Sequence, residues 1–150
     1  MPYRFLLVVA FSLSSLASVA QRAPKAIPRL APSFFTTYTY LTYTILDKGT
    51  SPEPMAASGV GGTLTLRPNG TYQKRLVLAG NGGSMRFDQD GRYTFAGNRI
   101  SFSYTTKQGQ ARTDQGTFRL RNGLLTLTLE GYPAGNQSTY TLKANVEMSE

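Results

Sequence analysis

Lys74 is the residue whose position most directly suggests chemistry. In the segment 72–78, apolar residues recur at every second position, and Lys74 shares their phase. A strand alternates its side chains between two faces, so a regular strand would point the Lys74 ammonium toward an apolar interior. An unpaired buried charge is costly. Three arrangements would relieve the cost: a β-bulge that shifts the register, a side chain that extends to solvent at the end of the fold, or an anionic head group bound inside.

Side chains that commonly carry catalysis are scarce. The chain has no His and no Cys, which excludes a Ser-His-Asp triad, a thiol nucleophile and the usual zinc sites. Asp88 and Asp90 are the closest carboxylates and could hold calcium or transfer protons, although a turn with Asp90 at its tip is the simpler interpretation. Asp114 and Glu130 have no acidic neighbour in the sequence. We therefore expect a protein that is not an enzyme, with no cofactor and no metal site.

The elements that position these residues are strands. Apolar and polar residues alternate between 91 and 129, and the pairs Gly97-Asn98 and Asn122-Gly123 interrupt the alternation. Both pairs tolerate the positive φ angles of tight hairpin turns. Segment 34–46 carries aromatic residues on both faces, which indicates a strand covered on both sides or placed where the chain closes on itself. Other strands are predicted at 62–67, 71–78, 84–88 and 138–146, with turns at 68–70, 80–83 and 89–91.

Two segments are interpreted as connections. Segment 47–61 holds Pro52, Pro54 and several small residues, and long loops of this kind are often functional or mobile. Segment 106–115 is polar and lacks apolar alternation, so it predicts a connection between hairpins. No segment predicts a helix. The closely spaced strands predict an all-β fold, an antiparallel up-and-down meander barrel of about eight or nine strands that leaves no exposed sheet edge.

The first 33 residues predict export. Residues 1–4 form a short, positively charged start that ends in Arg4, 5–16 are mostly apolar, and Ser18-Val19-Ala20 places small residues at a cleavage site, so 1–20 is expected to be a signal peptide. A membrane anchor is the alternative, but serines interrupt the apolar run. Prolines spaced four apart predict an extended leader over 21–33. A single β-barrel domain is expected over 34–150, in the periplasm or outside the cell, with no transmembrane span after signal removal.

The charge balance limits the partners. The chain has 16 Lys and Arg against 8 Asp and Glu, and removing Arg4 with the signal peptide leaves 15 against 8. Such a basic protein is attracted to anionic envelope surfaces, whereas export and the lack of a basic helix argue against nucleic acid. Two interpretations of the strand arginines stay open: a basic wall that meets an anionic surface, or solvated charges that oppose aggregation. These arginines are Arg67, Arg75, Arg92, Arg99, Arg119 and Arg121.

Segments 64–72, 91–100 and 116–127 resemble successive strands of the small exported bacterial lipocalin-like proteins, which have calycin-type β-barrels. The resemblance covers roughly 40–142. It implies a lipocalin-like barrel of the kind already expected from the strand pattern. The chain contains no Trp, so the Gly-x-Trp opening motif of lipocalins is absent, and so is a Thr-Asp-Tyr motif.

Inward-facing residues of an eight-stranded barrel either fill its interior or line a cavity for one small ligand. We expect non-catalytic binding or carriage of a small apolar or amphipathic ligand in the bacterial cell envelope. The alternative is an interaction module with a filled core that uses its basic face or the 47–61 loop to hold a protein or glycan. A cavity of several hundred Å³ favours the first. The predicted ligand-binding residues are Tyr72, Lys74, Tyr93, Phe95, Phe102, Tyr104 and Phe118.

Overall fold

Nine strands form the described part of the chain. The computed structural model describes residues 34–145, so the expected signal peptide, the proline-rich leader and the last residue of the predicted closing strand, Val146, lie outside the described residues. The strands are β1 (Thr37–Leu46), β2 (Met55–Ala56), β3 (Gly61–Leu66), β4 (Thr71–Gly80), β5 (Gly83–Ala96), β6 (Arg99–Thr105), β7 (Ala111–Arg121), β8 (Leu124–Glu130) and β9 (Gln137–Ala144).

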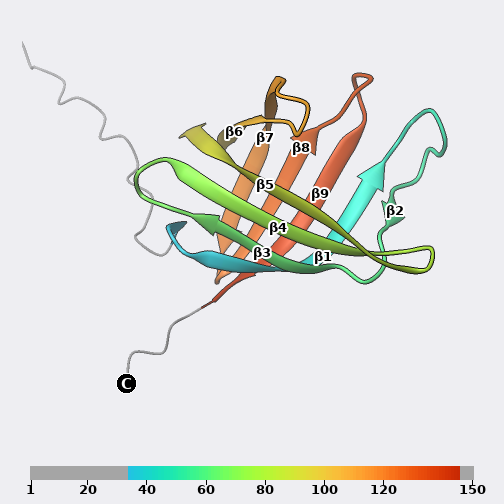
Figure 1. Ribbon diagram of the computed structural model, residues 1–150, viewed down its shortest axis with the longest axis horizontal. Helices are drawn as coiled ribbons and strands as arrows, with labels where there is room; N and C mark the ends of the chain where they lie inside the picture. The colour runs from blue at the N-terminus through green and yellow to red at the C-terminus, as the bar shows by residue number, and fades with distance from the viewer. Residues whose placement is uncertain (1–33, 146–150) are drawn as a thin grey trace, which may run out of the picture.

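The strands close into a barrel. From β3 to β9, each strand pairs antiparallel with the next, and β1 pairs with both β3 and β9. This ring of eight strands confirms the prediction of an all-β, up-and-down antiparallel barrel. In Figure 1, strands β3 to β5 pass in front of β7 to β9 and cross them steeply. Because the ring is closed, the strands pair around its whole circumference. Few backbone N–H and C=O groups are then left free to pair with another chain and cause aggregation.

Strand β1 closes the ring and changes partner halfway along. Its first half pairs with β3 and its second half with β2, while its other edge pairs with β9. A register shift between Tyr40 and Thr42 interrupts the β9 ladder, and Leu41 at the shift is 46% exposed. The shift changes the inward phase from Tyr38 and Tyr40 to Tyr43. The aromatic residues on both sequence phases of β1 therefore face the interior of the barrel. This confirms the interpretation that segment 34–46 lies where the chain closes on itself.

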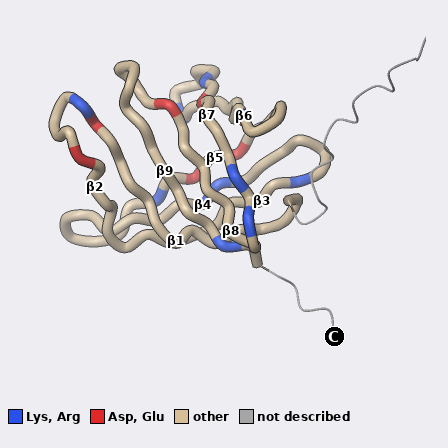
Figure 2. Tube along the Cα trace, turned by 180° about the vertical axis from the view of Figure 1, so that it is seen from behind, with Lys and Arg blue, Asp and Glu red and all other residues tan. Residues whose placement is uncertain are grey.

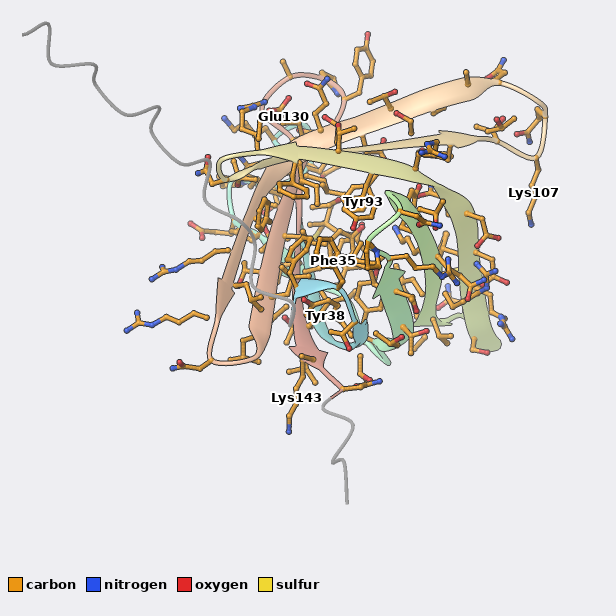
Figure 3. The ribbon with its side chains drawn as sticks, turned by 90° about the vertical axis from the view of Figure 1, so that its left-hand side faces the viewer. Phe35, Tyr38, Tyr93, Lys107, Glu130 and Lys143 are labelled. Atoms are coloured by element: carbon orange, nitrogen blue, oxygen red, sulfur yellow. The ribbon has the colours of Figure 1, made fainter. Side chains whose placement is uncertain are left out.

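Aromatic side chains fill one end of the barrel. Phe34 lies just before β1 and is fully buried. Its carbonyl accepts a hydrogen bond of 2.8 Å from the Tyr38 hydroxyl, and its ring contacts Tyr93, Phe95 and Phe118. Figure 3 shows Tyr38 and Tyr93 inside this end of the barrel. Burying this much aromatic surface is a major source of stability, and it makes this end solid.

The predicted turn at 89–91 is wrong. Strand β5 runs without interruption through these residues and pairs with β4 and then with β6. A Cβ added at Gly91 would lie 2.1 Å from the Ser103 carbonyl oxygen and 3.0 Å from the Tyr72 ring. The glycine is therefore needed where two strands approach closely, and not for a turn. The predicted short strand 84–88 is one part of β5.

The two predicted connections are also shorter than expected. The turn after β6 occupies residues 106–110, and β7 begins at Ala111. Ala111 to Thr113 are exposed on both faces of the strand. Because neither face packs against the core, the segment shows no alternation of apolar and polar residues from which a strand could be predicted. Segment 47–61 was predicted to be a loop throughout, but Met55 and Ala56 form the short strand β2, which pairs with Ile45 and Thr44 of β1. Strand β1 begins at Thr37, three residues after the start predicted at 34. Phe34 is instead buried in the closed end of the barrel, and we call it the Phe34 plug.

The two hairpin turns are confirmed. Two residues connect β5 to β6, since Ala96 pairs with Arg99, and Gly97 has a φ of 60°. Two residues also connect β7 to β8, where Asn122 has a φ of 52° and Gly123 a φ of 73°. The β7–β8 turn thus has positive φ at both central residues and the β5–β6 turn only at the first, Gly97. Two-residue turns with either pattern match the right-handed twist of the flanking strands.

We predict that Gly97→Val and Gly123→Val each lower the free energy of unfolding by about 1 kcal/mol or more, because a β-branched side chain is strained at positive φ. Gly83→Val is the control: a Cβ added at Gly83, Gly97 or Gly123 meets nothing within 4 Å, but the φ of Gly83 is not in the positive range. Chemical denaturation measures the three variants. Equal midpoints for all three would contradict the role of backbone strain.

Candidate functional site

The end of the barrel opposite the Phe34 plug holds a cavity of about 530 Å³. This volume lies within the range of roughly 300 to 1,000 Å³ that is usual for small-molecule sites. Met85 and Phe87 in its wall are 48% and 46% exposed, so the cavity is open to solvent. The lining residues are Tyr43, Ile45, Lys74, Leu76, Leu78, Met85, Arg86, Phe87, Asp88, Gln89, Tyr104, Lys107, Asp114 and Tyr140.

The β4–β5 hairpin supplies the apolar wall of this cavity. Leu76 pairs with Phe87 and Leu78 with Met85, and all four share the inward phase. Strand β6 pairs with β5 only from Gly91 onward, so this part of the hairpin extends past the neighbouring strand. The inward side chains of this part of the hairpin therefore face the open cavity, whereas inward side chains at the other end of the barrel pack in the hydrophobic core.

A second, smaller void of about 20 Å³ lies deeper and shares Lys74, Gln89, Asp114 and Tyr140 with the cavity. A void of this size can hold one water molecule, for which roughly 10–15 Å³ is needed. Its other lining residues are Tyr40, Leu64, Tyr72, Phe102, Leu127 and Leu129. We call Tyr72, Lys74, Gln89, Tyr104, Asp114 and Tyr140 the polar belt, because they place polar atoms around the two spaces.

Lys74 faces inward, as its phase predicted. Leu64 and Gln89 are its partners in continuous β3–β4 and β4–β5 ladders, so the bulge considered from sequence is absent at this position. The ammonium nitrogen lies 5.2 Å from the centroid of the Tyr140 ring, a favourable cation–π position. Burial lowers the Lys74 pKa, and the negative charge of Asp114 acts in the opposite direction. The strand therefore holds a cation at the inner end of the cavity.

Hydrogen bonds fix several members of the polar belt. The Tyr72 hydroxyl donates to Gln89 Oε1 at 2.6 Å, and the Tyr104 hydroxyl donates to Asp114 Oδ1 at 3.5 Å. Burial raises the pKa of Tyr72 and Tyr140, and burial followed by the charge of Asp114 raises that of Tyr104. These phenols are therefore neutral at neutral pH. The formal charges of the belt are those of Lys74 and Asp114.

The predicted site residues fall into two groups. Tyr72, Lys74 and Phe102 line the small void, and Lys74 and Tyr104 line the open cavity. The other three, Tyr93, Phe95 and Phe118, pack around Phe34 at the closed end and line neither space. Sequence alternation identifies the inward face of a strand, but it does not give the height of a residue along the barrel axis.

Sequence reasoning missed most of the residues that line the open cavity, and four of them show why. Gln89 was assigned to a turn and Asp114 to a connection, while Met85 and Phe87 were placed on a strand but not in the site. Extending the alternation of Tyr93 backward through β5 would have found three of them, because Gln89, Phe87 and Met85 share its phase.

Charges on the outer surface are dispersed. Figure 2 shows Lys and Arg on several separate strands and turns, with Asp and Glu among them. Arg75 pairs with Asp90 at 2.9 Å, and Arg99 pairs with Glu130 at 3.2 Å. Exposed pairs of this kind contribute little to stability. Their placement on the outward phase agrees with the sequence pattern and does not choose between the two interpretations of the arginines.

Within residues 34–145, no group of three or more His, Cys, Asp or Glu side chains could hold a metal ion. In the same range, no helix is long and apolar enough to cross a membrane.

We predict that Lys74→Met leaves the unliganded protein as stable as the parent or more stable, because it removes a charge from a desolvated position. Lys143→Met is the control, since Lys143 is an exposed residue on β9, and its effect should stay within about 0.5 kcal/mol. Urea denaturation measures both. A loss of more than about 1 kcal/mol for Lys74→Met would show instead that the ammonium stabilises the fold.

Comparisons with known proteins give little further guidance. No family model matches the chain, and no curated protein matches it. Among solved structures, the chain is similar to the crystal structure of a mutant of the fluorescent protein UnaG, with 9% sequence identity and a TM-score of 0.40, over 77% of this chain and 98% of that chain. The barrel is accordingly established by the strand pairing of this chain itself.

Proposed function

We propose that the protein binds one small amphipathic molecule inside the barrel without transforming it. The observation that carries the proposal is the open cavity of about 530 Å³, which combines an apolar wall with the half-buried cation of Lys74. The apolar part of the ligand lies against the β4–β5 hairpin, and its polar end lies at the belt. Clefts with this combination of many apolar and few polar groups are the usual form of a small-molecule site.

Lys74 sets the orientation of the ligand. Its ammonium is at the inner end of the cavity, whereas Met85 and Phe87 are at the solvent end. A negatively charged group next to Lys74 offsets the cost of burying the ammonium. The alternative expected from sequence, an interaction module with a filled core, is less well supported because one end of the interior holds an open cavity.

We predict that Phe87→Asp weakens the binding of both decanol and decanoate at least tenfold, about 1.4 kcal/mol, because it places a charge in the apolar wall. Leu124→Asp is the matched control, since Leu124 is 43% exposed and lies outside the cavity. Isothermal titration calorimetry below the critical micelle concentration measures both ligands. If the parent protein binds neither ligand, or if both variants lose equal affinity, the cavity is not the site.

The first 33 residues support a proposal for the location of the protein. We propose that the protein is an exported, lipocalin-like barrel of the bacterial envelope, and that its basic surface favours contact with anionic envelope components. The support is the basic start, the apolar run and the small residues before Gln21.

Removal of the signal peptide is directly measurable. Intact-mass analysis of protein exported by a bacterial host should give a chain that begins at Gln21, because Ser18-Val19-Ala20 matches the small-residue pattern of a cleavage site. A Ser18→Lys variant should be processed poorly and serves as the control. A product that retains residues 1–20 would contradict both the cleavage and the expected domain limits.

A further inference from the structure

Lys74 and Asp114 face the same two interior spaces from different walls. Lys74 lies on β4 and Asp114 on β7, three strands further around a closed ring of eight. Both residues line the small void and the open cavity. The interior therefore presents a cation and an anion across a space that a small molecule can enter.

The two charges do not neutralise each other by direct contact. Ion pairs in the described part of the chain join Arg75 to Asp90, Arg86 to Asp88 and Arg99 to Glu130, and none joins Lys74 to Asp114. The interaction between them is instead through space: the negative charge of Asp114 favours the charged form of Lys74. Asp114 therefore acts on Lys74 without occupying the hydrogen-bonding positions of its ammonium.

Both groups also have hydrogen-bonding capacity that these contacts leave unused. An ionised carboxylate has about four acceptor positions, and the bond that Asp114 accepts from Tyr104 is long, at 3.5 Å. An ammonium has three donors, and the contact of Lys74 is with the face of the Tyr140 ring. Donors of Lys74 and acceptors of Asp114 thus remain available at the two spaces that both residues line.

We propose that the polar belt binds the head group of a zwitterionic amphiphile, with the anionic group on Lys74 and the cationic group on Asp114. This inference rests on the proposed function and specifies the class of ligand. A simple anion would neutralise Lys74 but would add a second negative charge near Asp114, and a simple cation would do the reverse. A molecule that carries both signs satisfies both walls, and its chain then extends along Leu76, Leu78 and Phe87 toward solvent.

Four ligands with the same decyl chain test the head group: decanol, decanoate, decylammonium and the decyl betaine, a quaternary ammonium carboxylate. Calorimetric titration of the full exported protein, below the critical micelle concentration of each ligand, should give the betaine at least tenfold tighter than decanoate or decylammonium. This ranking is a property of the parent protein, so it does not depend on the folding of any variant.

Two substitutions assign the charges to their residues. Asp114→Asn should weaken betaine and decylammonium at least tenfold, leave decanol unchanged and leave decanoate unchanged or tighter. Lys74→Met should weaken betaine and decanoate and leave decanol unchanged. Asp90→Asn is the control, because Asp90 lies on the outer surface and pairs with Arg75, and it should leave all four affinities unchanged.

The outcomes separate the two levels of the proposal. If decanoate binds as tightly as the betaine, or if Asp114→Asn weakens decanol equally, the zwitterion inference is overturned while the binding of amphiphiles stands. If the parent protein binds none of the four ligands, the proposed function fails as well.

Discussion

The pairing of β1 with β9 is the interaction on which the rest of the structure depends. It joins the two ends of the described chain over nearly the full length of both strands, and it converts a meander with two open edges into a ring. Such non-local pairing is costly in loop-closure entropy, so it forms only if closure also buries a core. The aromatic residues of β1 meet this condition, because the register shift at Tyr40 keeps Tyr38, Tyr40 and Tyr43 all on the inner face.

Closure produces two different ends. At one end the ring surrounds Phe34, whose contacts with Tyr93, Phe95 and Phe118 leave a solid interior. At the other end β5 continues past its pairing with β6, so the β4–β5 hairpin carries its inward face into open space. The closed end supplies the hydrophobic stabilisation. The open end is therefore free to carry polar and charged groups that a filled core would exclude.

The polar belt lies between these two ends and accounts for the chemistry that we infer. Lys74 and Asp114 bring opposite charges to an interior surrounded by aromatic rings, and the fold holds both at positions where direct pairing does not occur. Groups fixed in this way are already oriented for a ligand, so little ordering cost remains when the ligand binds. The cost is borne by the unliganded protein, which keeps a partly desolvated ammonium.

Local pattern by itself determined the fold class, the two-residue hairpin turns and the inward direction of Lys74, because each depends only on the alternation of neighbouring residues or on the φ preference of a glycine. Local pattern did not determine which inward residues line a cavity. Phe95 and Phe102 have the same sequence signature, yet one packs near the plug and the other beside the void. That difference arises from the stagger of strands in the closed ring, which sets the height of each residue along the axis. The same stagger placed Asp114 across the interior from Lys74. Neither residue's own segment specifies this placement, because β4 and β7 are not paired with each other and their inner faces are brought together only when the barrel closes.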